Sequence, residues 1–163
     1  MSLWIIPKNS MKYVDYAVTF SEFPDQISLC INISGCDKHC PGCHSPELWE
    51  DVGTELTIQE LGRLIDQNKG ITLVGFMGGK PEVINTFAAY VKRNYPLLVG
   101  WYTGNTTFEG VNIYNFDYIK LGPYIAELGG LNNPKTNQRM YKMKYRSLID
   151  AEPIDITYRF YEK

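Results

Sequence analysis

Three closely spaced cysteines constrain this chain more than any other feature of its sequence. Cys36, Cys40 and Cys43 follow the spacing C-x3-C-x2-C, which supplies three soft thiolates from one tight loop. Pro41 fixes its own φ angle and Gly42 adopts backbone angles that other residues cannot, which suits a tight turn. The sequence therefore predicts a metal centre with three sulfur ligands.

Two kinds of metal centre fit this ligand set. Structural zinc sites and closed [4Fe–4S] clusters usually take four protein ligands, so three cysteines leave one iron of a [4Fe–4S] cluster open. A radical S-adenosylmethionine (SAM) enzyme needs such an open iron, because the iron binds the amino and carboxylate groups of SAM. The alternative is a Cys3His zinc site that includes His39 or His44. The spacing favours iron and sulfur, since no second Cys/His pair follows downstream.

The remaining cysteine has a different setting. Cys30 lies inside the apolar run 27–33, which is expected to form a strand that leads into the cysteine loop. A thiol within such a strand is more often a buried core side chain than a metal ligand. The predicted metal ligands are therefore Cys36, Cys40 and Cys43.

Length and composition set broad limits on the protein. At 163 residues the chain is expected to form a single domain, residues 1–163, with room for a hydrophobic core. A net charge of −2 gives no electrostatic case for binding nucleic acid or an anionic membrane. We expect no signal peptide and no spanning segment, because the longest apolar runs have the length of strands. The clustered cysteines suit a reducing cytoplasm better than a disulfide framework.

Strand and helix patterns alternate along the first two thirds of the chain. Helices are expected from Thr57, which forms a capping-box pattern with Glu60, to about Asn68, and again from Pro81 to about Asn94. The expected strands are 13–20, 27–33, 71–76, 97–102 and 117–121. This alternation predicts a parallel sheet with right-handed crossovers.

The last third breaks the alternation. A loop and the short segment 111–115 replace a helix after Thr103, and 138–145 and 154–160 alternate like strands. We therefore predict an α/β fold: a partial (β/α) barrel with a parallel sheet, flanking helices and a short C-terminal β extension. A full eight-stranded barrel needs more than 163 residues.

The second candidate site is the Gly78-Gly79 turn after the strand expected at 71–76. Ligands of parallel α/β proteins bind at the carboxyl ends of strands, and glycine lets the backbone come close to them. Thr103 follows the next expected strand, where packing of the aromatic strand end is the competing interpretation. Behind a three-cysteine loop, this turn becomes the expected second half of a SAM pocket. The predicted SAM contacts are Gly42, Cys43, His44, Gly78, Gly79 and Thr103.

The sequence resembles the glycyl-radical activases, a family of small radical SAM enzymes, and within it the activating proteins of the anaerobic ribonucleoside-triphosphate reductase. Glycine before the third cysteine, where most radical SAM enzymes have an aromatic residue, is typical of this subfamily. The matching stretches are 35–46, 76–79, 101–104, 116–124 and 136–139.

The resemblance implies a mechanism. A one-electron donor such as flavodoxin or ferredoxin would reduce the [4Fe–4S] cluster, which would cleave SAM to methionine and a 5′-deoxyadenosyl radical. This radical would take a hydrogen atom from a glycine Cα of the partner reductase. Because the cofactors supply the chemistry, no catalytic side chain is expected.

Three points stay open in this interpretation. The target could be another glycyl-radical enzyme, such as pyruvate formate-lyase, or the chain could be a non-enzymatic zinc or iron–sulfur binding module. Lys80 also departs from the family, whose members usually have Asp or Glu after the Gly-Gly pair. A second cation beside the SAM ammonium is unfavourable, so either Glu82 supplies the acid or Lys80 points outward and backbone carbonyls bind the ammonium.

Overall fold

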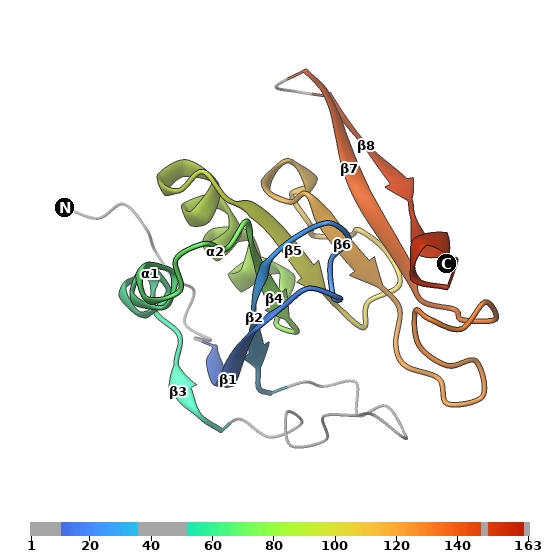
Figure 1. Cartoon of the computed structure of the whole chain (residues 1–163), viewed down its shortest axis with the longest axis horizontal. Coiled ribbons are helices and arrows are strands. Elements are labelled where there is room, and N and C mark those ends of the chain that lie inside the picture. The colour runs from blue at the N-terminus through green and yellow to red at the C-terminus, as the bar shows by residue number, and fades with distance from the viewer. Residues whose placement is uncertain (1–10, 36–51, 148–149, 162–163) are drawn as a thin grey trace.

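Eight strands form one mixed sheet in the computed structural model, which describes residues 11–35, 52–147 and 150–161. The strand order is β3-β1-β2-β4-β5-β6-β7-β8 (Figure 1). The elements are β1 (Lys12–Thr19), β2 (Ser28–Ile33), β3 (Thr54–Glu55), α1 (Ile58–Gln67), β4 (Leu73–Met77), α2 (Pro81–Asn94), β5 (Leu98–Tyr102), the 3-10 helix η2 (Ile113–Asn115), β6 (Tyr118–Leu121), β7 (Arg139–Ser147), β8 (Asp150–Asp155) and the 3-10 helix η3 (Thr157–Phe160).

Parallel strands make up the centre of the sheet, and antiparallel strands extend both sides. β2, β4, β5 and β6 are parallel neighbours, whereas β1 pairs antiparallel with β2 and β7 pairs antiparallel with β6. The α/β class, the parallel centre, the flanking helices and the C-terminal β extension are therefore confirmed. Closure toward a barrel is not shown, because β3 and β8 end the strand order within the described residues.

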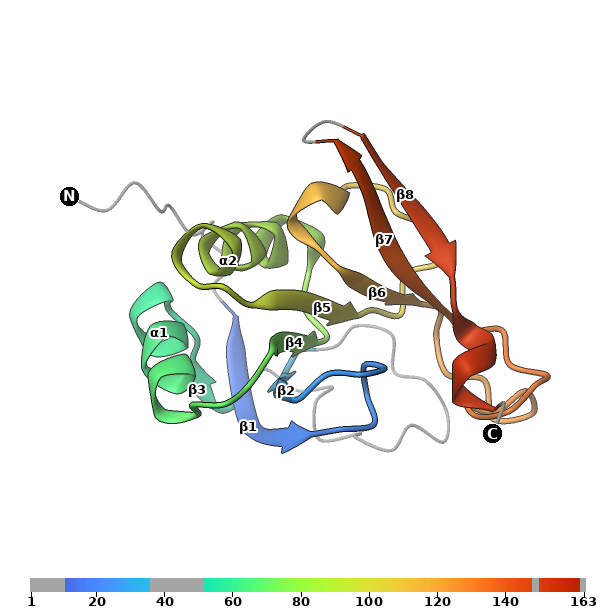
Figure 2. The ribbon, with the colours of Figure 1, turned by 45° about the horizontal axis from the view of Figure 1, so that its top comes forward.

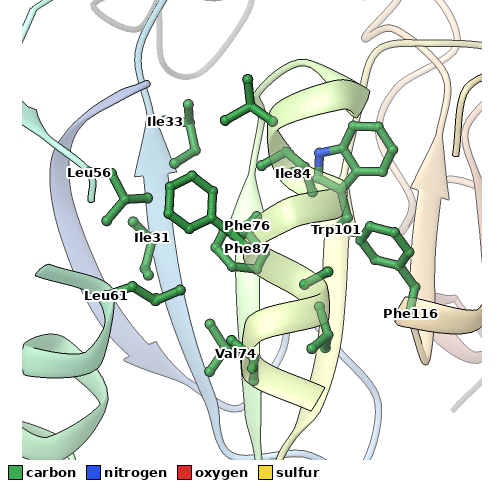
Figure 3. Packing of buried hydrophobic residues seen from close by; sticks show 14 of the residues in the cluster. Ile31, Ile33, Leu56, Leu61, Val74, Phe76, Ile84, Phe87, Trp101 and Phe116 are labelled. Atoms are coloured by element: carbon green, nitrogen blue, oxygen red, sulfur yellow. The ribbon is translucent and has the colours of Figure 1, made fainter. Parts of the chain in front are cut away.

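One face of the sheet carries both α-helices, and the main core lies between these helices and the sheet. Alternate strand residues such as Ile31, Phe76 and Trp101 point into this layer and are fully buried there (Figure 3). Phe87 of α2 packs on Phe76 at a ring separation of 6.2 Å. The opposite face carries no α-helix in the described part of the chain, only the short 3-10 helix η3 at one side, and we call it the helix-free face (Figure 2). None of the described helices is long and apolar enough to cross a membrane.

The structure differs from the predicted elements in two places. The strand predicted at 154–160 is wrong beyond Asp155, because the carboxylate of Asp155 accepts hydrogen bonds from the backbone N–H and hydroxyl of Thr157. This local turn competes with the strand ladder and starts η3. The strand β3 was missed, since its two residues are too few to form a pattern. The predicted helix from Pro81 to Asn94 is confirmed.

The N-terminus of α1 gives a prediction on stability. The hydroxyl of Thr57 accepts a hydrogen bond from the backbone N–H of Glu60 at 3.0 Å, while the Glu60 carboxylate pairs with Arg63. Thr57→Ala leaves that N–H without its cap and is expected to lower the free energy of unfolding by about 1 kcal/mol. Thr57→Ser keeps the acceptor and serves as the control. Urea denaturation measures the difference, and equal stability of the two variants would contradict the capping role.

Candidate cluster and cofactor site

The carboxyl ends of the four parallel strands meet at one edge of the sheet. The register places Met77 of β4 beside Tyr102 of β5, and Tyr102 beside Lys120 of β6. The cysteine loop follows β2, the Gly-Gly turn follows β4, and Thr103 follows β5. The fold therefore gathers the starts of all three predicted site segments at the edge where parallel α/β proteins bind ligands.

The central part of the cysteine loop, residues 36–51, lies outside the described residues. This segment contains the predicted iron ligands Cys36, Cys40 and Cys43 and the predicted SAM contacts Gly42, Cys43 and His44. Their roles stay predictions. The structure does define both ends of the loop, at Gly35 and at Val52.

Both ends of the loop are attached to the start of β1. On the incoming side, the backbone N–H of Ser34 donates to the carbonyl of Lys12 at 2.9 Å. On the outgoing side, Glu55 of β3 pairs with Lys12 and Thr54 pairs with Tyr13. Main-chain hydrogen bonds to the same short stretch of β1 therefore hold the two described ends of the loop at the carboxyl edge.

Gly53 lets the outgoing end of the loop pair with β1, and its role was not predicted from the sequence. Its φ angle is +107°, and a Cβ atom added there would lie 2.2 Å from the carbonyl oxygen of Tyr13. A side chain at this position would collide with the backbone of β1, which cannot turn aside. Gly53 therefore lets the returning chain lie directly against the strand that holds the loop.

The Gly78-Gly79 turn needs glycine for its conformation. The φ angles are +110° and +95°, which residues with side chains rarely adopt. The indole N–H of Trp101 donates to the carbonyl of Gly78 at 2.8 Å, so the turn is fixed to β5. A Cβ atom on Gly79 would lie 2.8 Å from both Ile84 and Met11. A bulky residue at Gly79 would therefore disturb the core, and contact of Gly79 with SAM stays a prediction.

Thr103 and Lys120 form a buried polar corner at the same edge. Thr103 is 6% exposed, and its hydroxyl oxygen accepts a hydrogen bond from the backbone N–H of Asn105. The ammonium of Lys120 donates to the carbonyls of Thr103 and Gly122 at 3.2 and 3.1 Å and lies 5.3 Å from the ring centre of Tyr102. Contact of Thr103 with SAM stays a prediction, and the buried cation of Lys120 was missed.

Lys80 and Glu82 both have exposed side chains at the start of α2. The carbonyl of Lys80 accepts the first backbone hydrogen bonds of the helix, from Val83 and Ile84, while its side chain makes no capping bond. Glu82 lies in the first turn, where a negative charge complements the helix dipole. An effect of either side chain on SAM binding stays a prediction.

Cys30 is confirmed as a core thiol. It is 4% exposed, and burial, opposed by a contact of the thiol with the hydroxyl of Thr19, raises its pKa to about 11. Ligation of iron or zinc requires the thiolate, which this environment disfavours. Among residues 11–35, 52–147 and 150–161, no group of three His, Cys, Asp or Glu side chains could hold a metal ion.

A comparison with family profiles gives one match, described as a 4Fe-4S single cluster domain, over residues 27–120. The matched stretch covers more than half of the chain and runs from the start of β2 into β6. It includes the cysteine loop, the Gly-Gly turn and Thr103. Searches of curated proteins and of solved structures gave no match.

Proposed function

Because this chain belongs to the family of 4Fe-4S single cluster domains, we propose that it is a radical SAM activase that generates a glycyl radical on a partner enzyme. We further propose the anaerobic ribonucleoside-triphosphate reductase as that partner, on the strength of the sequence resemblance. One observation carries the proposal: the three-cysteine loop leaves and rejoins the sheet at the edge that also bears the Gly78-Gly79 turn.

The residues of the loop fit the proposed cofactors. Thiolates are soft ligands that select iron–sulfur clusters, and Cys36, Cys40 and Cys43 would leave one iron of a [4Fe–4S] cluster for SAM. When bound, the reduced cluster supplies the electron that cleaves SAM. The chain itself would hold the cluster, orient SAM between the Gly42–His44 and Gly78–Gly79 segments, and keep water away.

Anaerobic reconstitution with iron and sulfide tests the activity. We expect about four iron and four sulfide ions per chain and, after reduction in the presence of SAM, release of 5′-deoxyadenosine. Zinc in place of iron, or a cluster that leaves SAM intact, would contradict the proposal and favour a non-enzymatic binding module. Reduced flavodoxin or ferredoxin in place of a chemical reductant tests the proposed electron donor.

The target enzyme needs a separate test. Electron paramagnetic resonance of the activated mixture is expected to show a glycyl radical on the anaerobic ribonucleoside-triphosphate reductase and none on pyruvate formate-lyase. The opposite result would keep the activase and replace its partner.

The proposed chemistry also needs reducing surroundings, which is why we propose a cytoplasmic location.

A further inference from the structure

Residues 20–27, which connect β1 to β2, cross the helix-free face of the sheet, and we call them the strap. In Figures 1 and 2 the strap is the blue segment that leaves β1 and passes over the central strands on the side away from α2. Two tyrosine hydroxyls fix it to the sheet, since Tyr102 donates to the carbonyl of Glu22 and Tyr118 donates to the carbonyl of Pro24. Burial raises the pKa of Tyr102 well above its usual value, so its hydroxyl remains a donor.

Phe23 of the strap lies directly on the backbone of the sheet. Gly75 of β4 and Gly100 of β5 are paired neighbours, and neither has a side chain to hold the ring away. A Cβ atom added at Gly75 would lie 2.6 Å from this ring, and one at Gly100 would lie 2.3 Å from it. The ring is 0% exposed, so it fills the space above these two glycines.

The second half of the strap is attached to the rest of the protein by side-chain hydrogen bonds. Asp25 forms two hydrogen bonds with the guanidinium of Arg159 in η3, at 2.7 and 3.0 Å. Gln26 accepts a hydrogen bond from the hydroxyl of Thr72, which precedes β4. The strap is therefore attached both to Thr72, just before β4, and to the C-terminal 3-10 helix η3, which suits a fixed cover.

Phe23 is a neighbour of the strand ends that form the carboxyl edge, where the candidate site lies. The ring of Tyr102, the last residue of β5, meets the ring of Phe23 at 5.1 Å and an interplanar angle of 73°. Met77, the last residue of β4, packs against the apolar cluster that contains Phe23. On the helix-free face, Phe23 is thus a direct neighbour of the Gly-Gly turn and the polar corner, and it lies on the side of them that faces the amino ends of the strands.

We propose that Phe23 and the strap form the floor of the ligand site, which means its boundary toward the amino ends of the strands. SAM would lie on the carboxyl side of Phe23. The strap would seal the helix-free face, so that water does not reach SAM from the amino edge of the sheet. The identity of the ligand rests on the proposed function, whereas the seal rests on the packing of Phe23. Phe23 is a positioning residue in this proposal. A dry floor matters because exclusion of water strengthens electrostatic interactions with the ligand and protects reactive intermediates.

Alkylation of Cys30 tests the seal without any ligand. Cys30 borders the same space, since the Cβ atom added at Gly75 would lie 3.4 Å from its sulfur atom. Phe23→Ala is expected to admit water and iodoacetamide and to lower the thiol pKa that burial has raised, so that the labelling rate rises about tenfold. Mass spectrometry of the Cys30 peptide measures the rate. Phe87→Ala, the same truncation in the opposite core layer, is expected to leave it unchanged. Equal Cys30 labelling in Phe23→Ala and the wild type would overturn the seal.

Calorimetric titration of SAM into the reconstituted protein tests the floor. Phe23→Leu is expected to weaken binding about fivefold and Phe87→Leu less than twofold, although each replaces a fully buried aromatic ring. Equal effects would show that Phe23 acts only through general stability and would overturn the floor. If the wild type binds no SAM, the proposed function and the assigned ligand fail, while the Cys30 labelling still decides the seal. The leucine variant also replaces Phe23→Ala in the labelling test if the alanine protein does not fold.

Discussion

Serine at Cys36, Cys40 or Cys43 is expected to abolish assembly of the [4Fe–4S] cluster and to lower the rate of SAM cleavage more than about a hundredfold. Loss of an outer-shell partner of a metal ligand already costs 10–100-fold in metal affinity or activity, and loss of the ligand itself costs more. A serine hydroxyl stays protonated at neutral pH and is a poor ligand for iron in a cluster. Iron and sulfide content and release of 5′-deoxyadenosine under anaerobic conditions measure the effect.

Cys30→Ser is the matched control for these variants. The side chain lies in the core of the helix-free face, so the hydroxyl is expected to cost about 1–2 kcal/mol of stability and to leave cluster loading unchanged. A fully loaded, active Cys36 or Cys43 variant would contradict the ligand assignment. Loss of the cluster in a folded Cys30→Ser protein would contradict it equally.

Gly53→Ala is expected to lower the free energy of unfolding by about 3–4 kcal/mol. The new Cβ atom would lie 2.2 Å from the carbonyl oxygen of Tyr13, and the backbone would be held at a φ angle of +107°. Overpacking of a fixed contact costs about 1–3 kcal/mol and backbone strain of this kind a similar amount. Urea denaturation measures the loss. Because β3 would be pushed off β1, we also expect poor loading of iron in the folded fraction.

Gly70→Ala separates the two contributions. Gly70 also has a positive φ angle, +93°, but no atom lies within 4 Å of an added Cβ there. The substitution should therefore cost only the backbone strain, about 1–2 kcal/mol. Equal losses of stability at Gly53 and Gly70 would show that the contact with Tyr13 contributes nothing.

Local patterns in the sequence were sufficient to predict the edge that bears the site. The cysteine loop, the Gly-Gly turn and Thr103 each follow an apolar run, and parallel strands carry their carboxyl ends to a common edge. The helix over Pro81–Asn94 was equally predictable, since Pro81 marks its first turn and its apolar residues recur at helical spacing. Each of these features depends on residues that are close in the sequence.

Contacts between distant residues were not predictable in the same way. Gly75 and Gly100 stand inside strands, where a glycine often marks a close approach of another group. Nothing local identifies that group as Phe23, which comes from a connection far earlier in the chain. Lys120 gave a weaker hint as a charged residue in an apolar strand, but the carbonyls that bind it belong to the fold rather than to its neighbours.

The attachment of both loop ends to β1 has a consequence for repair after exposure to oxygen. Peptide groups of Met11, Lys12 and Tyr13 hold the residues on either side of segment 36–51, and iron takes no part in those bonds. Oxidative loss of the metal should therefore leave the sheet and the loop ends in place. We therefore expect resupply of iron and sulfide to restore the proposed cluster without unfolding and refolding of the chain.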